Sequence, residues 1–336
     1  MSSVRSTFTP ALTLLWFVLF LLCLLLPKVT LAKNLEEPET VKVTVLSAFS
    51  TSQERELLHA FRQTLLEKHN LRVEEKFVFW QRQEGWQQQL ESNNPDLLVA
   101  IGNQSFEKVQ PLELSTPVLA LMINQKTFQQ LETQSPDNYY AITHSQPIER
   151  FVQLAKSLNV YQAQIGSFIS PKTKQNIKKF DSLATFYDLS YRPVMVQPKL
   201  NGRDAMSQLA MCCSVIILES DCVFRPGKIR KSILVNAYRQ RIIVIAHSES
   251  VLKEGAMLTL FSQPYDIGQQ AANLFGDLLN DSLKQRFQYP KRFSIGINRK
   301  IARLLGYDDI TVGGLMQKIE TLDFIQNIAD RKIESQ

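Results

Sequence analysis

The stretch 215–222, which reads VIILESDC, carries the most conspicuous chemistry of the sequence. An apolar run of strand length ends in Glu219, Ser220, Asp221 and Cys222, so two acids, a hydroxyl and a thiol follow one another directly. Three interpretations are open at this point: a catalytic centre, the mouth of a ligand-binding cleft, or a strand that simply reaches water.

The catalytic interpretation has little support in the rest of the chain. Cys222 would need a base such as His144 or His247, and neither histidine lies in a sequence context typical of catalysis. Pro226 also delays the helix start at which a reactive cysteine is usually activated. The two acids stand at alternate positions where the strand ends, and such a pair need not face one substrate. We therefore expect a protein that is not an enzyme.

The patterns of common cofactor sites are missing from the sequence. It has no His-x-His or Cys-x-x-Cys pattern, so we expect no metal, and no Gly-rich phosphate loop, so we expect no other cofactor. The net charge of +6 is mild and the charges are interspersed. Nucleic acid is therefore not expected as a partner.

Strands and helices alternate along the chain, which is typical of α/β architecture. Apolar runs of strand length occur in two series, at 41–49, 73–79, 96–102 and 117–123, and then at 163–169, 191–196, 214–218 and 242–246. Continuous apolar strands suit a parallel sheet that helices cover on both faces. We expect two doubly wound α/β lobes joined by a multi-strand hinge. Lobe 1 is predicted at 41–145 with a later segment near 258–283, and lobe 2 at 146–257 with a later segment near 284–325.

The first 32 residues have the three-part layout of a cleavable secretory signal. Arg5 supplies the positive region, residues 11–26 are apolar, and Thr30 and Ala32 are small residues at the cleavage positions. An uncleaved N-terminal anchor is the alternative. The signal predicts that the protein is periplasmic.

Candidate ligand-binding residues follow from a rule for open α/β sheets, in which ligands bind beyond the carboxyl ends of the strands. The loops at those positions hold Ser50, Thr51, Asn103, Gln104, Ser105, Phe168, Asp221, Phe224 and His247. Helix N-termini at two of these loops offer N–H donors to a carboxylate, and phenylalanines offer a flat apolar wall. The alternative is that the polar residues only cap helices and that the phenylalanines only fill cores.

The second half of the chain contains short motifs in a familiar order. Gly255 and Ala256 precede a short strand, and Gly268 lies in the next helix. The segments QYP at 288–290 and ARLLG at 302–306 follow in the same order. In order and spacing the chain resembles the ABC-transporter substrate-binding proteins of the tryptophan/tyrosine-type family over residues 41–320. The resemblance implies a type I periplasmic-binding-protein fold, whose two hinged lobes close on a small organic solute.

The resemblance also implies a role for Asp221, which stands where the family places an acid that would hold a cationic part of the ligand. The first lobe departs from the family pattern at 102–105, where a Gly-Thr-type turn is usual, and at 124–126. These departures affect the ligand more than the fold.

We therefore expect a monomeric periplasmic solute-binding protein that closes on a small amino-acid-like ligand, with aromatic amino acids among the options. Its protein partner would be an ABC permease. The alternative is a periplasmic sensing module that signals through a membrane receptor without transport. A structural descendant of the fold that binds no ligand is a third interpretation.

Overall fold

The structure is a computed structural model that describes residues 37–112, 114–161, 163–171, 173–196, 202–219 and 228–334. The predicted signal at 1–32 lies outside these residues, as do Asp221 and Phe224. From Pro38 onward the chain forms one compact unit. None of the helices in the described part of the chain combines the length and apolar character that a membrane crossing requires.

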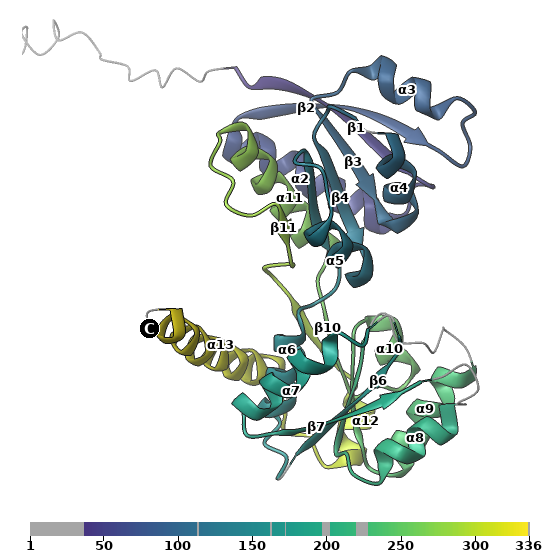
Figure 1. Ribbon diagram of the computed structural model, residues 1–336, viewed down its shortest axis with the longest axis vertical. Coiled ribbons are helices and arrows are strands. Elements are labelled where there is room, and N and C mark those ends of the chain that lie inside the picture. The colour runs from purple at the N-terminus through teal and green to yellow at the C-terminus, as the bar shows by residue number, and fades with distance from the viewer. Residues whose placement is uncertain are drawn as a thin grey trace, which may run out of the picture. The chain divides into compact units, whose positions relative to one another are not determined.

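The first sheet contains six strands within the described residues (Figure 1). They are β1 (Glu39–Ser47), β2 (Leu71–Phe79), β3 (Leu97–Ile101), β4 (Val118–Ile123), β5 (Tyr139–Thr143) and β11 (Phe287–Gln288). Their order is β11-β5-β4-β3-β1-β2, and all neighbours are parallel. The carboxyl ends of these strands therefore lie at one edge of the sheet, and β2 is an edge strand.

The second sheet also contains six described strands, with one exception to the parallel rule. The strands are β6 (Gln164–Ile169), β7 (Ser190–Met195), β8 (Val215–Leu218), β9 (Ile243–Ala246), β10 (Leu258–Phe261) and β12 (Ser294–Ile297). Their order is β12-β10-β9-β8-β6-β7, and only β12 runs antiparallel to its neighbour, β10.

Helices cover both faces of the first sheet (Figure 1). On one face α2 (Ser52–His69) and α11 (Pro264–Leu279) bury Leu57, Phe61 and Phe275 against the alternate strand positions Val43 and Val45. The opposite face is covered by α3 (Trp86–Asn93), α4 (Gly102–Val109) and α5 (Gln125–Thr133), and a short helix η1 (Gln110–Leu112) follows α4. Burial of this apolar surface on both faces is the main stabilising contribution to the lobe.

The second sheet is covered in the same way. One face packs against α6 (Ile148–Ser157), α7 (Asn176–Phe186), α12 (Arg299–Leu305) and α13 (Val312–Glu334). The other packs against α8 (Gly202–Ala210), α9 (Lys228–Arg239) and α10 (Glu249–Glu254). Each sheet with its helices is one doubly wound lobe, as the alternating pattern predicted.

The chain passes between the lobes at three connections, which are β5 to α6, β10 to α11 and β11 to β12. The predicted multi-strand hinge is therefore confirmed. The lobe segments near 258–283 and 284–325 remain predictions. By sheet membership, β10 belongs to the second lobe and β11 to the first.

Candidate functional site

A hollow of about 650 Å³ opens at the carboxyl ends of strands from both sheets. We call it the strand-end hollow. Its lining includes Thr51, Glu54, Gly102, Met122 and His144 from the first lobe, and His247, Glu249, Lys253 and Phe261 from the second. Volumes of roughly 300–1,000 Å³ are typical of small-ligand sites.

Side chains at the start of α2 cap the N-terminus of this helix. Thr51 is the N-cap, with an extended backbone at φ −105° and ψ 165°, and its hydroxyl accepts a bond of 3.1 Å from the Glu54 N–H. The Glu54 carboxylate accepts in return from the Thr51 N–H at 3.1 Å and from the Ser47 hydroxyl at 2.8 Å. This capping box satisfies donors that a ligand carboxylate would otherwise find at α2.

The N-terminus of α4 lacks such a cap. Its N-cap residue is Ile101, which makes no side-chain hydrogen bond to the first turn. Gly102 begins the helix at φ +80°, a conformation that favours glycine, and a Cβ built there would meet no atom within 4 Å. Since Ile101 and Gly102 both line the strand-end hollow, the first turn of α4 offers it uncapped N–H donors. The N-terminus of α10 at the same hollow also lacks a side-chain cap, but Glu249 in its first turn opposes an anion.

The next two residues of α4, Asn103 and Gln104, do not line the strand-end hollow. The Asn103 Oδ1 accepts a 2.8 Å bond from the Asn124 backbone N–H and so fixes the loop between β4 and α5. Gln104 is exposed on the helix surface.

A bulge at the end of β4 gives the hollow an unusual backbone. The register of β4 with β5 shifts between Leu121 and Ile123, and Met122 between them has φ 57°. A non-glycine residue in this region is strained, and such strain often accompanies function. The Met122 carbonyl accepts a 3.1 Å bond from Nδ1 of His144, which follows β5.

His247 repeats this arrangement in the second lobe. It follows β9, and its Nδ1 donates to the carbonyl of Leu218 at the end of β8 over 3.2 Å. Because a carbonyl can only accept, each Nδ1 carries the proton, and in the neutral ring of His247 the acceptor is Nε2. Burial lowers the pKa of His247 to about 4; the bond to Leu218 opposes this shift and the nearby charge of His144 adds to it.

The low pKa predicts that acid destabilises the protein through His247. An unfolded histidine titrates near 6.5, whereas folded His247 stays neutral until about pH 4. Between these values the unfolded chain binds a proton that the folded chain does not, so the free energy of unfolding falls as the pH drops. We expect this one group to account for a loss of about 2 kcal/mol, after allowance for its partial exposure.

Urea unfolding at pH 7 and pH 4.5 measures this loss. His247→Gln should lose about 2 kcal/mol less stability on acidification than the wild type. The control His59→Gln, which changes an exposed histidine of α2, should behave as the wild type does. Equal acid sensitivity of the wild type and His247→Gln would contradict the assignment.

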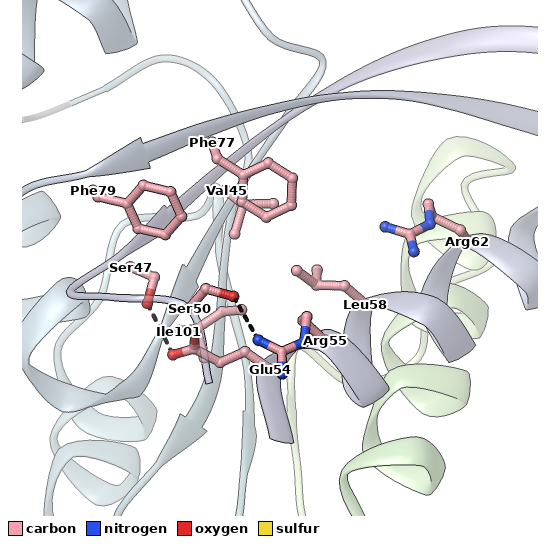
Figure 2. A pocket seen from close by; sticks show the side chains of 10 residues that line it. All are labelled: Val45, Ser47, Ser50, Glu54, Arg55, Leu58, Arg62, Phe77, Phe79 and Ile101. Carbon is pink, nitrogen blue, oxygen red and sulfur yellow. Dashed lines mark hydrogen bonds between the residues drawn. The ribbon is translucent and has the colours of Figure 1, made fainter. Parts of the chain in front are cut away.

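The structure brings two of the predicted residues, Thr51 and His247, to the strand-end hollow. Ser105 is buried and its hydroxyl accepts a 3.2 Å bond from the Trp80 indole N–H. Phe168 is only 2% exposed and packs in the core under α8 and α9. Ser50 lines a second hollow between α2 and β2 (Figure 2). Roles of all the predicted residues in ligand binding stay predictions.

The sequence analysis did not name the other lining residues of the strand-end hollow as site residues, among them Gly102, Met122 and His144. Gly102 and His144 directly follow strands, so the strand-end rule that selected His247 could have selected them. Met122 has no signal of its own, because a bulge depends on how β4 pairs with β5.

Two doubly wound lobes, three connecting segments and a hollow at the strand ends define a two-lobed ligand-binding protein with the type I periplasmic-binding-protein fold. The sequence profile described as ABC transporter substrate binding protein matches residues 84–309. This match covers more than half of the chain, and the protein belongs to that family. No curated protein matches the chain.

Three solved structures show the same fold. A substrate-binding protein with adhesive properties from Clostridium difficile, in its ligand-free open structure, is 14% identical with a TM-score of 0.63, covering 81% of this chain and 96% of that one. An ABC domain from Streptococcus pneumoniae in complex with L-Trp is 16% identical with a TM-score of 0.53, covering 80% and 95%. A conserved domain protein from Vibrio cholerae is 19% identical with a TM-score of 0.52, covering 83% and 98%. At these identities the similarity shows the fold alone.

Family membership confirms the recognition made from the short motifs. The protein is a substrate-binding protein of an ABC transporter and binds a small ligand as part of that system. Because the family is one of solute-binding proteins, the prediction that the chain is not an enzyme is also confirmed.

Proposed function

We propose that the protein binds an amino-acid-like solute, with an aromatic side chain as the preferred variant, in the strand-end hollow and delivers it to an ABC importer from the periplasm. The observation that carries this proposal is that the uncapped N-terminus of α4 and the neutral imidazole of His247 line the same hollow. Together they offer an anion site and a neutral acceptor in one hollow, as a zwitterion requires.

The ligand carboxylate is assigned to the first turn of α4. The helix macrodipole and the N–H groups of that turn favour a negative group. The first turn of α4 contains no acid, whereas the first turn of α2 contains Glu54. The choice of α4 over α2 therefore rests on both the free cap and the local charge.

The ligand ammonium is assigned to the opposite part of the hollow. Nε2 of neutral His247 can accept a hydrogen bond, and the Glu249 carboxylate at the start of α10 adds a negative charge. Asp221 remains a predicted further acid. A cation there would disfavour protonation of His247, consistent with the low pKa that burial imposes on it.

Apolar groups complete the site. Ile101, Met122 and Phe261 contribute side chains to the hollow, and Met and aromatic residues adapt well to flat apolar ligands. The complex of a similar fold with L-Trp supports an aromatic amino acid as the first ligand to test.

Isothermal titration calorimetry with the twenty amino acids, followed by matched analogues of the tightest one, tests the proposal. Conversion of the carboxylate to a carboxamide should weaken binding by about 10- to 100-fold, which corresponds to about 1.5–3 kcal/mol for charge-assisted hydrogen bonds. His247→Gln should weaken binding of the intact amino acid, whereas the control His59→Gln should not.

Two results would overturn the proposal. One is an affinity that does not change when the carboxylate is removed. The other is the absence of binding by any amino acid while a sugar or another neutral solute binds. Uptake of labelled ligand by cells with and without the protein then separates import from sensing, because a sensor leaves uptake unchanged.

A further inference from the structure

A second hollow, of about 380 Å³, lies within the first lobe between α2 and the carboxyl end of β2 (Figure 2). We call it the α2–β2 hollow. Among the described residues, it shares only Glu54 and Ile101 with the lining of the strand-end hollow. Its floor is apolar and buried, with Val45 from β1 and Leu58 from α2.

Two aromatic rings form one wall of the α2–β2 hollow. Phe77 and Phe79 are two residues apart on β2, so they project from the same face of this edge strand. Their rings are stacked, with centroids 6.0 Å apart and an interplanar angle of 13°. Phe77 nevertheless remains 42% exposed, although most residues on this face of the sheet are covered by α2 and α11. A stacked aromatic surface left open beside a cavity is typical of a binding site for a flat apolar group.

The charged residues that line the hollow all come from α2, and the two positive charges of Arg55 and Arg62 exceed the one negative charge of Glu54. Glu54 is held by the Thr51 N–H and the Ser47 hydroxyl in the capping box. Arg62 is paired with Glu75 of β2 at 2.5 Å. Among the described residues, the Arg55 guanidinium donates a hydrogen bond to the Ser50 hydroxyl, at 3.3 Å, and makes no ion pair.

A guanidinium without an acid partner beside an apolar cavity selects the charge of the occupant. Arg55 offers a planar fork of donors that matches a carboxylate, whereas Ser50 is a weak neutral partner. Glu54 opposes an anion less than its charge suggests, since two donors already bind its carboxylate.

We propose that the α2–β2 hollow is a second ligand site, selective for small planar aromatic carboxylates. The aromatic ring lies against Phe77 and Phe79, and the carboxylate binds Arg55. This site is distinct from the amino-acid site proposed in the strand-end hollow and does not depend on it. It accepts an aromatic acid that lacks an ammonium group, because no uncommitted acid among the described lining residues would hold one.

Calorimetry with indole-3-acetate tests the site, with two matched probes. Tryptamine keeps the ring but replaces the anion by a cation, and cyclohexanecarboxylate keeps the anion but lacks the flat ring. We expect indole-3-acetate to bind at least tenfold more tightly than either. Phe77→Ala and Arg55→Gln should each weaken its binding at least tenfold, while thermal unfolding shows that both variants are folded.

Matched control variants show whether a loss of indole-3-acetate binding is specific to the α2–β2 hollow. Phe324→Ala removes an exposed phenylalanine of α13, and Arg72→Gln removes an exposed arginine of β2; neither should change the affinity for indole-3-acetate. His247→Gln should also leave it unchanged, because that residue lines only the other hollow of the two.

The proposal is overturned if indole-3-acetate does not bind, or if Phe77→Ala and Arg55→Gln bind it as the wild type does. Loss of binding in His247→Gln alone would place the probe in the strand-end hollow. A Phe77→Ala variant with unchanged affinity for all probes but reduced solute uptake would instead assign the aromatic wall to contact with a partner protein.

Discussion

Replacement of Gly268 by alanine is expected to destabilise the first lobe by about 3 kcal/mol or more. Gly268 lies in α11 where this helix crosses α2. A Cβ at this position would lie 2.1 Å from the backbone carbonyl oxygen of Leu57 and 3.0 Å from the Cβ of Ala60. A backbone oxygen cannot rotate away as a side chain can, so the two helices must separate and lose contacts across the core they cover.

Urea unfolding of Gly268→Ala against Gly313→Ala measures this effect. Gly313 lies near the start of α13, and a Cβ there meets no atom within 4 Å. Alanine at that position should be neutral or stabilising by up to about 1 kcal/mol, since it has the higher helix propensity. If Gly268→Ala were as stable as Gly313→Ala, the close approach of α2 and α11 would be wrong.

Gly268 also shows what the sequence could predict about the fold and what it could not. The order of apolar runs predicted two doubly wound lobes, because continuous apolar strands must be covered on both faces. The short motif around Gly268 contributed to the family resemblance. Its physical reason, the contact with the Leu57 backbone, joins residues more than 200 positions apart and has no trace in local spacing.

The candidate site was predictable to a similar extent. Thr51 and His247 follow strands and carry polar groups, so the strand-end rule found them. The same rule selected Phe168, but an aromatic side chain at the end of a strand can equally point into the core, and this one does. The capping box of α2 has a signature in the sequence, Thr51 followed three residues later by Glu54, which the sequence analysis did not use. The uncapped start of α4 follows from Ile101, which cannot cap a helix, but only once the end of β3 is known to lie at that residue.

The capping box of α2 is the structural element shared by the two proposed sites. Glu54 lines both hollows and holds Thr51, which lines the strand-end hollow, and Ser47, which lines the α2–β2 hollow. Occupants of the two hollows would therefore lie near the same carboxylate. Calorimetry with both ligands present would detect any coupling, which must be equal in the two directions.

Replacement of Gln153 by alanine is expected to weaken the attachment of α13 to the second lobe by about 3 kcal/mol. Gln153 of α6 is fully buried, and its Nε2 lies 3.0 Å from the Tyr187 hydroxyl, 2.7 Å from an Asp323 carboxylate oxygen and 3.3 Å from the Gln326 side-chain oxygen. Alanine would leave a cavity and remove a charge-assisted hydrogen bond from Asp323.

Hydrogen exchange measures where the stability is lost in Gln153→Ala. We expect the loss of amide protection to concentrate in α13 and not to spread over the lobe. The start of α13 is anchored separately, by buried Leu315 and Ile319 and by the 2.9 Å bond from Lys318 to the Ser157 carbonyl. Amide protection should therefore fall most beyond residue 320, in the part of the helix that Asp323 and Gln326 attach. Gln317→Ala, an exposed change in the same helix, should leave the exchange pattern as it is in the wild type. Uniform loss of protection across both lobes in Gln153→Ala would mean that this glutamine supports the core of the lobe as a whole and not the attachment of its last helix.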